Sequence, residues 1–314
     1  MIGGTGFVGS HLIERLVREG AHVLCVSRSN ERLAEDAPCK GDVEYKLSNI
    51  TDLEQITQTL VAFRPAAVFH LAAHPDASES PSHRTMCLNV NLSGTVNVLE
   101  AARKAKAQSF IYAHSSKAYG NVSFPNRIDS PMAPICSYAI AKSAAWQLCQ
   151  TISQIENDID VVGLCPTFIY GARQNWNLIN YVYDCVQRDR PVRLAGGSQT
   201  RDPLFVDDAI DAFVRASMVP QANGHAIPIG GGHEITVVEF CRAILASLNS
   251  DLPIEEGAQA ARPTEIWRSF ADNSAASQLL GWTPRTSLRE GLAILAEERR
   301  VPEQPARIAL SAAS

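Results

Sequence analysis

The stretch MIGGTGFVGSHL, residues 1–12, decides the fold class of this chain. Gly3, Gly6 and Gly9 form a G-x-x-G-x-x-G spacing that runs into LIERLVREG, which has the apolar periodicity of an amphipathic helix. Such a loop lets a dinucleotide pyrophosphate approach the backbone at a helix N-terminus, where unpaired N–H groups and the helix dipole favour negative charge. The loop normally follows a strand. Only Met1 and Ile2 precede it here, so we expect the first strand to be truncated.

Segments with strand and helix character alternate after this loop. Strands are expected at residues 21–28, 43–47, 66–73, 110–116 and 160–166, and helices at 51–63, 86–107 and 137–155. This alternation implies right-handed βαβ units. The sequence therefore predicts an α/β fold with a Rossmann-type, doubly wound parallel sheet.

The regularity of the pattern divides the chain. Residues 1–165 are expected to form the dinucleotide-binding Rossmann domain. Past Pro166 the pattern loosens, with helices near 179–187, 207–218 and 237–248. Residues 166–300 are therefore expected to form a smaller substrate-binding region that is partly interleaved with the Rossmann sheet. Residues 301–314 are expected to be a flexible tail.

Composition limits the partners of the protein. The 314 residues are 46% hydrophobic and carry a formal net charge of −5, which gives no general attraction to nucleic acid or anionic lipid. No apolar run is long enough to span a membrane, and no signal segment precedes the glycines. The eight cysteines show no metal-ligand spacing. We therefore expect a cytoplasmic protein with reduced thiols, no metal, and neither a nucleic-acid nor a membrane partner.

The strand expected at residues 21–28 ends on Ser27 and Arg28, where a dinucleotide-binding fold usually carries the acid that binds the ribose. No carboxylate stands there. An arginine at this point can bind the 2′-phosphate of NADP, although it can equally be a solvated loop charge. The sequence predicts NAD or NADP as the cofactor, with a lean to NADP.

Tyr138 and Lys142, in the segment SYAIAK, are the strongest candidates for catalysis. Four residues apart on a helix, their side chains share one face, so the ammonium is expected to lie near the phenol and to lower its pKa. A phenol tuned in this way can exchange a proton with a sugar hydroxyl. Ser115 ends a predicted strand at the edge of the sheet where ligands collect, and its hydroxyl can hold the same oxygen.

Together these segments resemble the extended short-chain dehydrogenases, in particular the NAD-dependent epimerase/dehydratase family that acts on nucleotide sugars. The resemblance covers nearly the whole chain. The motifs that carry it are GGTGFVGSHL, VFHLAAH, NLSGTVNVLEAAR, SSKAYG, CPTFIYGARQ, GGSQTRDPLFVDDA and RPTEIWRSFADNSAASQLLGWTPRTSLREGL.

The resemblance implies roles for particular residues. Ser115, Tyr138 and Lys142 match the catalytic triad of the family. The residues implied to bind the cofactor are Gly3, Gly6, Phe7, Val8, Gly9, Arg28, Asn49, Ile50, Leu71, Ala72, Ala73, Asn91, Tyr138, Lys142 and Pro166. Those implied to bind the substrate are Ser116, Lys117, Arg201 and Arg262, the two arginines at its pyrophosphate. The resemblance also implies a homodimer that pairs through the helices near residues 89–105 and 138–152.

The sequence departs from the family at two places. Sugar 4,6-dehydratases carry an acidic pair after the catalytic Ser or Thr, and Ser116 and Lys117 stand there instead. Serine is a poor general acid near neutral pH, so the usual dehydration is disfavoured, although some relatives that act on CDP-linked sugars have a lysine at the second place. Members also normally have a strand of about six residues before the first glycine. An upstream start, a fragment or a shortened protein would each explain its absence.

These observations favour an NAD(P)-dependent epimerase that acts on a nucleotide sugar by transient hydride transfer, most simply a 4-epimerase. The alternatives are an NADPH-dependent nucleotide-sugar 4-ketoreductase, to which Arg28 points, and a sugar dehydratase. A non-catalytic dinucleotide-binding protein is a further alternative if the first strand is missing, because buried backbone groups without partners cost about 1–3 kcal/mol each.

Overall fold

A computed structural model describes residues 1–29, 43–75, 79–122, 124–174, 177–258 and 260–299 of the chain. The flexible tail expected at residues 301–314 lies outside the described residues. The strands are β1 (Val23–Ser27), β2 (Val43–Leu47), β3 (Ala67–His70), β4 (Ser109–Ala113), β5 (Asp160–Pro166), β6 (Phe168–Tyr170), β7 (Val192–Arg193), β8 (Thr200–Arg201), β9 (Pro203–Phe205), β10 (Ala226–Ile229), β11 (Ile235–Thr236) and β12 (Ile254–Glu255).

The helices are α1 (Phe7–Arg18), α2 (Leu53–Phe63), α3 (Pro81–Cys87), α4 (Gly94–Lys104), α5 (Ser137–Glu156), α6 (Leu178–Gln187), α7 (Val206–Ala216), α8 (Val237–Ser247), α9 (Ser274–Leu280) and α10 (Leu288–Glu298). A π-helical segment, Leu88–Ser93, joins α3 to α4, and Ser116–Tyr119 and Pro220–Ala222 are 3₁₀ turns. The single helix expected at residues 86–107 is therefore wrong in detail. It begins earlier, at the Ser80 cap before Pro81, and its pitch widens across the π-helical segment.

The central sheet is parallel and is held together in the middle by residues 1 and 2. Strands β10, β5, β4 and β3 pair in that order, and β1 pairs with β2. Ile2 bridges the two groups, because it pairs in parallel with Val26 of β1 and with His70 of β3. Its N–H donates to Phe69 at 2.9 Å, and its carbonyl accepts from Leu71 at 2.9 Å. The short N-terminal segment thus takes the central place that the glycine loop requires.

The gap between β1 and β3 continues beyond Met1 as a cavity of about 320 Å³. Its walls are largely apolar and include Leu24 of β1, Val68 of β3 and Phe63 of α2. Two residues therefore supply the sheet pairing at the glycine loop, while the rest of the slot between the two strands has no main chain from the described residues in it.

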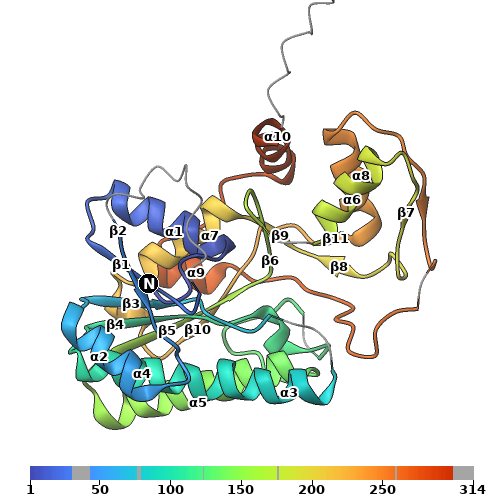
Figure 1. Cartoon of the computed structure of the whole chain (residues 1–314). Coiled ribbons are helices and arrows are strands. Elements are labelled where there is room, and N and C mark those ends of the chain that lie inside the picture. Colours follow the sequence, from blue (N-terminus) through green and yellow to red (C-terminus); the bar gives the residue numbers. More distant parts are fainter. Residues whose placement is uncertain (30–42, 76–78, 123, 175–176, 259, 300–314) are drawn as a thin grey trace, which may run out of the picture.

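Helices cover both faces of this sheet, as expected for a doubly wound fold (Figure 1). On one face α2 packs against α4 and α4 against α5, while on the other α1 packs against α7 and α7 against α9. Apolar side chains on the inner sides of these helices form two core clusters, with Leu12 and Phe213 in one and Leu60 and Trp146 in the other. The α/β class and the parallel sheet predicted from the sequence are confirmed.

The second half of the chain contributes to both lobes of the molecule. Strand β10 joins the central sheet beside β5, which the sequence analysis missed because AIPI is short and contains a proline. The smaller lobe holds α6, α8 and the strand pairs β7–β12 and β8–β11 (Figure 1). Strands β6 and β9 pair with each other between the two lobes.

Among the described residues, no helix has the length and apolarity needed to cross a bilayer. No group of three or more His, Cys, Asp or Glu side chains in these ranges could hold a metal ion. The seven cysteines that the structure describes are buried and are not joined in disulfides, and Cys39 lies outside the described residues.

Candidate functional site

The glycine loop is shaped by contacts that leave no room for larger residues. Gly3 has φ +82°, and a Cβ on it would lie 2.6 Å from the backbone nitrogen of Ala72. A Cβ on Gly9 would lie 2.4 Å from the carbonyl oxygen of Gly3. The loop therefore packs directly on the chain that leaves β3 and on the first turn of α1.

The N-terminus of α1 is suited to bind an anion. The helix begins at Phe7, with Val8 in the same half-buried turn, and its N-cap Gly6 offers no side chain to the free N–H groups. No acidic residue stands in the first turn. Unpaired N–H groups, the helix dipole and the open glycine backbone together fit a dinucleotide pyrophosphate.

The other predicted cofactor residues lie at the carboxyl ends of neighbouring strands. Arg28 is exposed after β1, and Asn49 is exposed after β2. Leu71, Ala72 and Ala73 follow β3, and Pro166 ends β5. Ile50 is buried, packs against Gly94 and accepts a 3.0 Å hydrogen bond from Asn97 at its carbonyl oxygen, so its side chain supports α4. The structure thus gathers these segments at one edge of the sheet, where ligands of open α/β folds bind.

Asn91 is buried in the π-helical segment and binds the loop after β3. Its Oδ1 accepts a 2.7 Å hydrogen bond from the backbone N–H of His74, and its Nδ2 donates to the carbonyl of His74 at 3.1 Å. Thr95 donates to the backbone carbonyl of Asn91 at 2.8 Å and contacts the buried His70 ring at 2.9 Å. In this structure Asn91 therefore fixes the chain that follows Ala73.

The predicted triad converges where β4 ends and α5 begins. Ser115 follows β4 and hydrogen-bonds the half-buried phenol of Tyr138. Lys142, one turn along α5, is 1% exposed, and its Nζ donates to the backbone carbonyl of Ala113 at 2.5 Å. The structure thus brings all three residues to the same strand end.

The electrostatics of the triad differ from the expectation. Burial raises the pKa of Tyr138 to about 12, and the hydrogen bond with Ser115 opposes this only in part. Burial also lowers the pKa of Lys142 to about 7. The expected lowering of the tyrosine pKa by Lys142 is therefore not seen in this arrangement. The reason is that desolvation of the phenol outweighs the charges near it, while the ammonium is turned toward Ala113.

The segment 262–269 contacts two of the predicted substrate residues, Ser116 and Arg201. Ser116 lies 3.4 Å from Ser269, hydroxyl to hydroxyl, and both are buried. Arg201 of β8 forms a 2.6 Å ion pair with Glu265 and donates to the carbonyl of Ile266 at 2.8 Å. This segment therefore connects the strand end after β4 to the smaller lobe.

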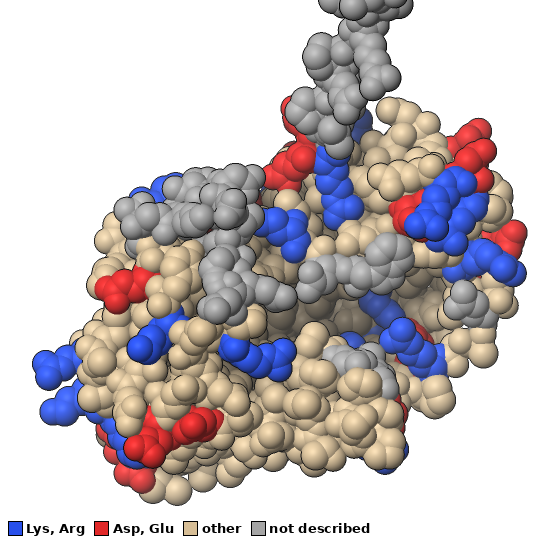
Figure 2. Space-filling view, in the orientation of Figure 1, with Lys and Arg blue, Asp and Glu red and all other residues tan. Residues whose placement is uncertain are grey.

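Arg262 is exposed, and its carbonyl accepts from Glu265 at 3.0 Å, so it stands in the turn that precedes the Arg201 partner. Figure 2 shows a hollow between the two lobes, with Lys and Arg side chains beside it. Cations at such a hollow suit a substrate that carries a diphosphate.

Two acidic residues shape the site although the sequence analysis did not select them. Glu79 accepts hydrogen bonds from the N–H and hydroxyl of Ser137, at 2.9 and 2.5 Å, and so caps the helix that carries Tyr138. Asp202, beside Arg201, accepts backbone N–H groups of Ala271 and His233, and burial raises its pKa to about 6. Both contacts are long-range, and neither residue belongs to a local sequence pattern that would have identified it.

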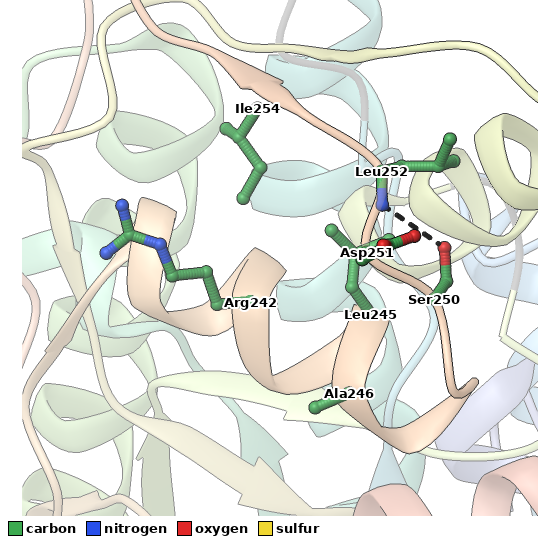
Figure 3. A pocket seen from close by; sticks show the side chains of 7 residues that line it. All are labelled: Arg242, Leu245, Ala246, Ser250, Asp251, Leu252 and Ile254. Carbon is green, nitrogen blue, oxygen red and sulfur yellow. Dashed lines mark hydrogen bonds between the residues drawn. The ribbon is translucent and has the colours of Figure 1, made fainter.

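A separate pocket of about 290 Å³ lies in the smaller lobe. Its wall is made by α8 and by the chain that leads to β12, and Figure 3 shows its seven lining side chains. They are Arg242, Leu245, Ala246, Ser250, Asp251, Leu252 and Ile254. None of the predicted site residues lines this pocket, so it is not part of the candidate site.

Comparisons with known proteins agree with this geometry. The model of the NAD dependent epimerase/dehydratase family matches residues 1–230. A UDP-glucose 4-epimerase of Mycolicibacterium smegmatis is 32% identical over 301 residues, which are 93% of this chain and 95% of that protein.

Two solved structures extend the likeness to the fold. The UDP-glucose 4-epimerase of Thermotoga maritima with UDP-glucose has a TM-score of 0.86 and 26% identity, and the match covers 94% of this chain and 96% of that one. MoeE5 in complex with UDP-glucuronic acid and NAD has a TM-score of 0.84 and 27% identity, with the same coverage of both chains. MoeE5 holds NAD both in its complex with UDP-glucuronic acid and in its complex with UDP-glucose, so the lean to NADP finds no support. The family model over residues 1–230 and the 32% identity to a 4-epimerase show that the chain belongs to the NAD-dependent epimerase/dehydratase family.

Proposed function

We propose that this protein is an NAD-dependent nucleotide-sugar 4-epimerase. The observation that carries the proposal is the meeting of Ser115, Tyr138 and Lys142 at one strand end, on the same sheet edge as the glycine loop. The relatives named as 4-epimerases support the reaction, and the nucleotide sugars in the solved structures support the class of substrate.

The reaction needs a base and a hydrogen bond at one sugar oxygen. Tyr138 takes the proton of the C4 hydroxyl and later returns it, while the Ser115 hydroxyl holds the same oxygen. A bound nicotinamide would supply the acceptor and donor of the C4 hydride. We assign Lys142 to the ribose of the cofactor because it lies one turn along α5 from Tyr138, at the same strand end.

The remaining site residues are assigned to binding either the cofactor or the substrate. Gly3, Gly6 and Gly9, with the start of α1, bind the cofactor pyrophosphate. Arg201 and Arg262 bind the diphosphate of the substrate, for which Arg201 must exchange part of its pairing with Glu265. We assign NAD rather than NADP because the solved structures with a dinucleotide support NAD.

We also infer a homodimer that pairs through the helices near residues 89–105 and 138–152, which the structure shows as the π-helical segment with α4 and as α5. Several apolar side chains there are exposed, among them Ile140, Leu148 and Ile155 of α5 and Leu88 of the π-helical segment. Light scattering at micromolar concentration tests this, and a monomer would contradict it. We infer a cytoplasmic location because the described cysteines are buried and are not joined in disulfides, which suits a reducing compartment.

The decisive experiment follows sugar products and cofactor absorbance together. We expect purified protein with NAD to interconvert the 4-epimers of a UDP-sugar without net change in reduced nicotinamide. A ketoreductase would instead consume NADPH in proportion to product, and a dehydratase would release a 4-keto-6-deoxy sugar. Loss of all turnover but retained NAD binding would favour a non-catalytic dinucleotide-binding protein.

A further inference from the structure

Lys117 places a positive charge beside the predicted base. Its Nζ lies 5.6 Å from the ring centroid of Tyr138. Lys117 is the second residue of the 3₁₀ turn Ser116–Tyr119, and its backbone N–H donates to the hydroxyl of Ser115 at 3.2 Å. The half-buried side chain of Lys117 therefore lies beside Tyr138, and its backbone is bonded to Ser115. These are the two residues that would act on the sugar oxygen.

The acidic side chains around this turn have other partners. Glu79 is held by Ser137, and Glu265 is paired with Arg201. Over the part of the chain that the structure describes, no carboxylate forms an ion pair with Lys117. The charge of Lys117 is thus left for a group that comes with the ligand.

Two uses of this charge can be separated. If Lys117 served to ionise Tyr138, the pKa of the phenol would fall, but burial raises that pKa to about 12 and only Ser115 opposes the rise. An ammonium over the face of a ring is attracted to its π electrons and is not directed at the hydroxyl. Recognition of a substrate group is the use that the contacts support.

We propose that Lys117 binds a carboxylate on the sugar, so that the preferred substrate is a nucleotide-linked uronic acid. This rests on the proposed function, because it takes the C4 hydroxyl to lie at Tyr138. The C6 group is attached to C5, the neighbour of C4, and in a uronic acid it carries a negative charge. The flexible four-carbon stem of lysine lets its ammonium reach a group one or two carbons from the reacting hydroxyl, where it makes a charge-assisted hydrogen bond.

The test compares kcat/KM for UDP-glucuronate and UDP-glucose in the presence of NAD. We expect the wild type to prefer UDP-glucuronate and Lys117→Met to lower the uronate-to-glucose ratio by about 10- to 100-fold, the usual worth of a hydrogen bond to a charged group. Lys117→Arg keeps the charge and should keep most of the preference. Lys106→Met removes an exposed lysine before β4, at the opposite end of that strand, and should leave the ratio unchanged.

A binding measurement separates failure of this inference from failure of the proposed function. Calorimetric titration of NAD-loaded protein should show tighter binding of UDP-glucuronate than of UDP-glucose, with the difference lost in Lys117→Met. A 4-epimerase whose substrate ratio and binding difference do not respond to Lys117→Met would overturn the uronate inference alone. If neither sugar is epimerised while the binding difference persists, the proposed function fails and recognition by Lys117 stands.

Discussion

The ammonium of Lys142 donates a 2.5 Å hydrogen bond to the backbone carbonyl of Ala113, the last residue of β4. The same ammonium lies 4.4 Å from the ring centroid of Tyr112. The long side chain thus ties α5 to the strand it crosses, and its charge is removed from water at the place where the triad assembles.

This burial predicts a pH dependence of stability. Burial lowers the pKa of Lys142 to about 7 from 10.5, so between these values the unfolded chain binds a proton that the folded chain does not. Stability from this group therefore rises as pH increases from about 7 toward 10. Lys142→Met should lack this rise, and urea unfolding of both proteins at about pH 7 and pH 9 measures it. Equal changes with pH in the two proteins would refute the lowered pKa.

Removal of the Tyr138 hydroxyl should separate chemistry from folding. Tyr138→Phe keeps the ring, so NAD affinity and melting temperature should stay close to those of the wild type, while turnover falls by about 10²–10⁴-fold. Tyr183→Phe is the matched control, because the Tyr183 hydroxyl is buried on α6 without a hydrogen-bond partner. Turnover of Tyr138→Phe above roughly a tenth of wild type would show that the assigned base is wrong.

Arg201 should affect substrate binding more than the chemical step. Arg201→Met removes a guanidinium assigned to the substrate diphosphate, so KM for the nucleotide sugar should rise by about 10- to 100-fold with a smaller change in kcat. Arg193→Met is the control, because Arg193 is an exposed residue of β7 whose ion pair with Glu255 lies away from the triad. An unchanged KM for Arg201→Met would remove Arg201 from the substrate site.

The cavity between β1 and β3 predicts a route to higher stability. An extension of about six strand-forming residues before Met1 would place apolar side chains in this cavity and pair with both neighbouring strands. We expect a higher melting temperature and tighter NAD binding than for residues 1–314 alone. An extension of the same length made of Gly and Ser is the control, and equal melting temperatures for the two extensions would show that the cavity does not accept a strand.

Local signals in the sequence predicted the regular elements well. The helix expected at residues 51–63 forms as α2, and the Asp52 carboxylate caps it by accepting the N–H of Gln55 at 3.0 Å. The expected bounds of β2 and β5 agree with the structure because each is a compact run of strand-forming residues between turn signals. The family was likewise predicted correctly, from motifs with a fixed spacing.

Features that depend on distant contacts were not predicted. No local pattern shows that Ile2 pairs on both sides, or that Glu79 caps Ser137. The helical spacing of Tyr138 and Lys142 correctly placed both on one helix, but it could not show that Ala113 would capture the ammonium. Sequence spacing determines which side chains share a helix face. Which group then accepts a hydrogen bond from Lys142 depends on the strand that packs beside the helix.

The backbone pairing at residues 1–3 is the boundary between two groups of strands in the sheet, and we call this boundary the seam. On one side lie β1 and β2, on the other β3, β4, β5 and β10, and across the seam run backbone hydrogen bonds from Met1, Ile2 and Gly3. Partial opening at this seam would release the amides of β1 and β2 to exchange with solvent before those of β4 and β5. The glycine loop begins at the same three residues. A dinucleotide bound to this loop would therefore stabilise the closed seam and raise the free energy of opening it. The two groups of strands would then unfold together.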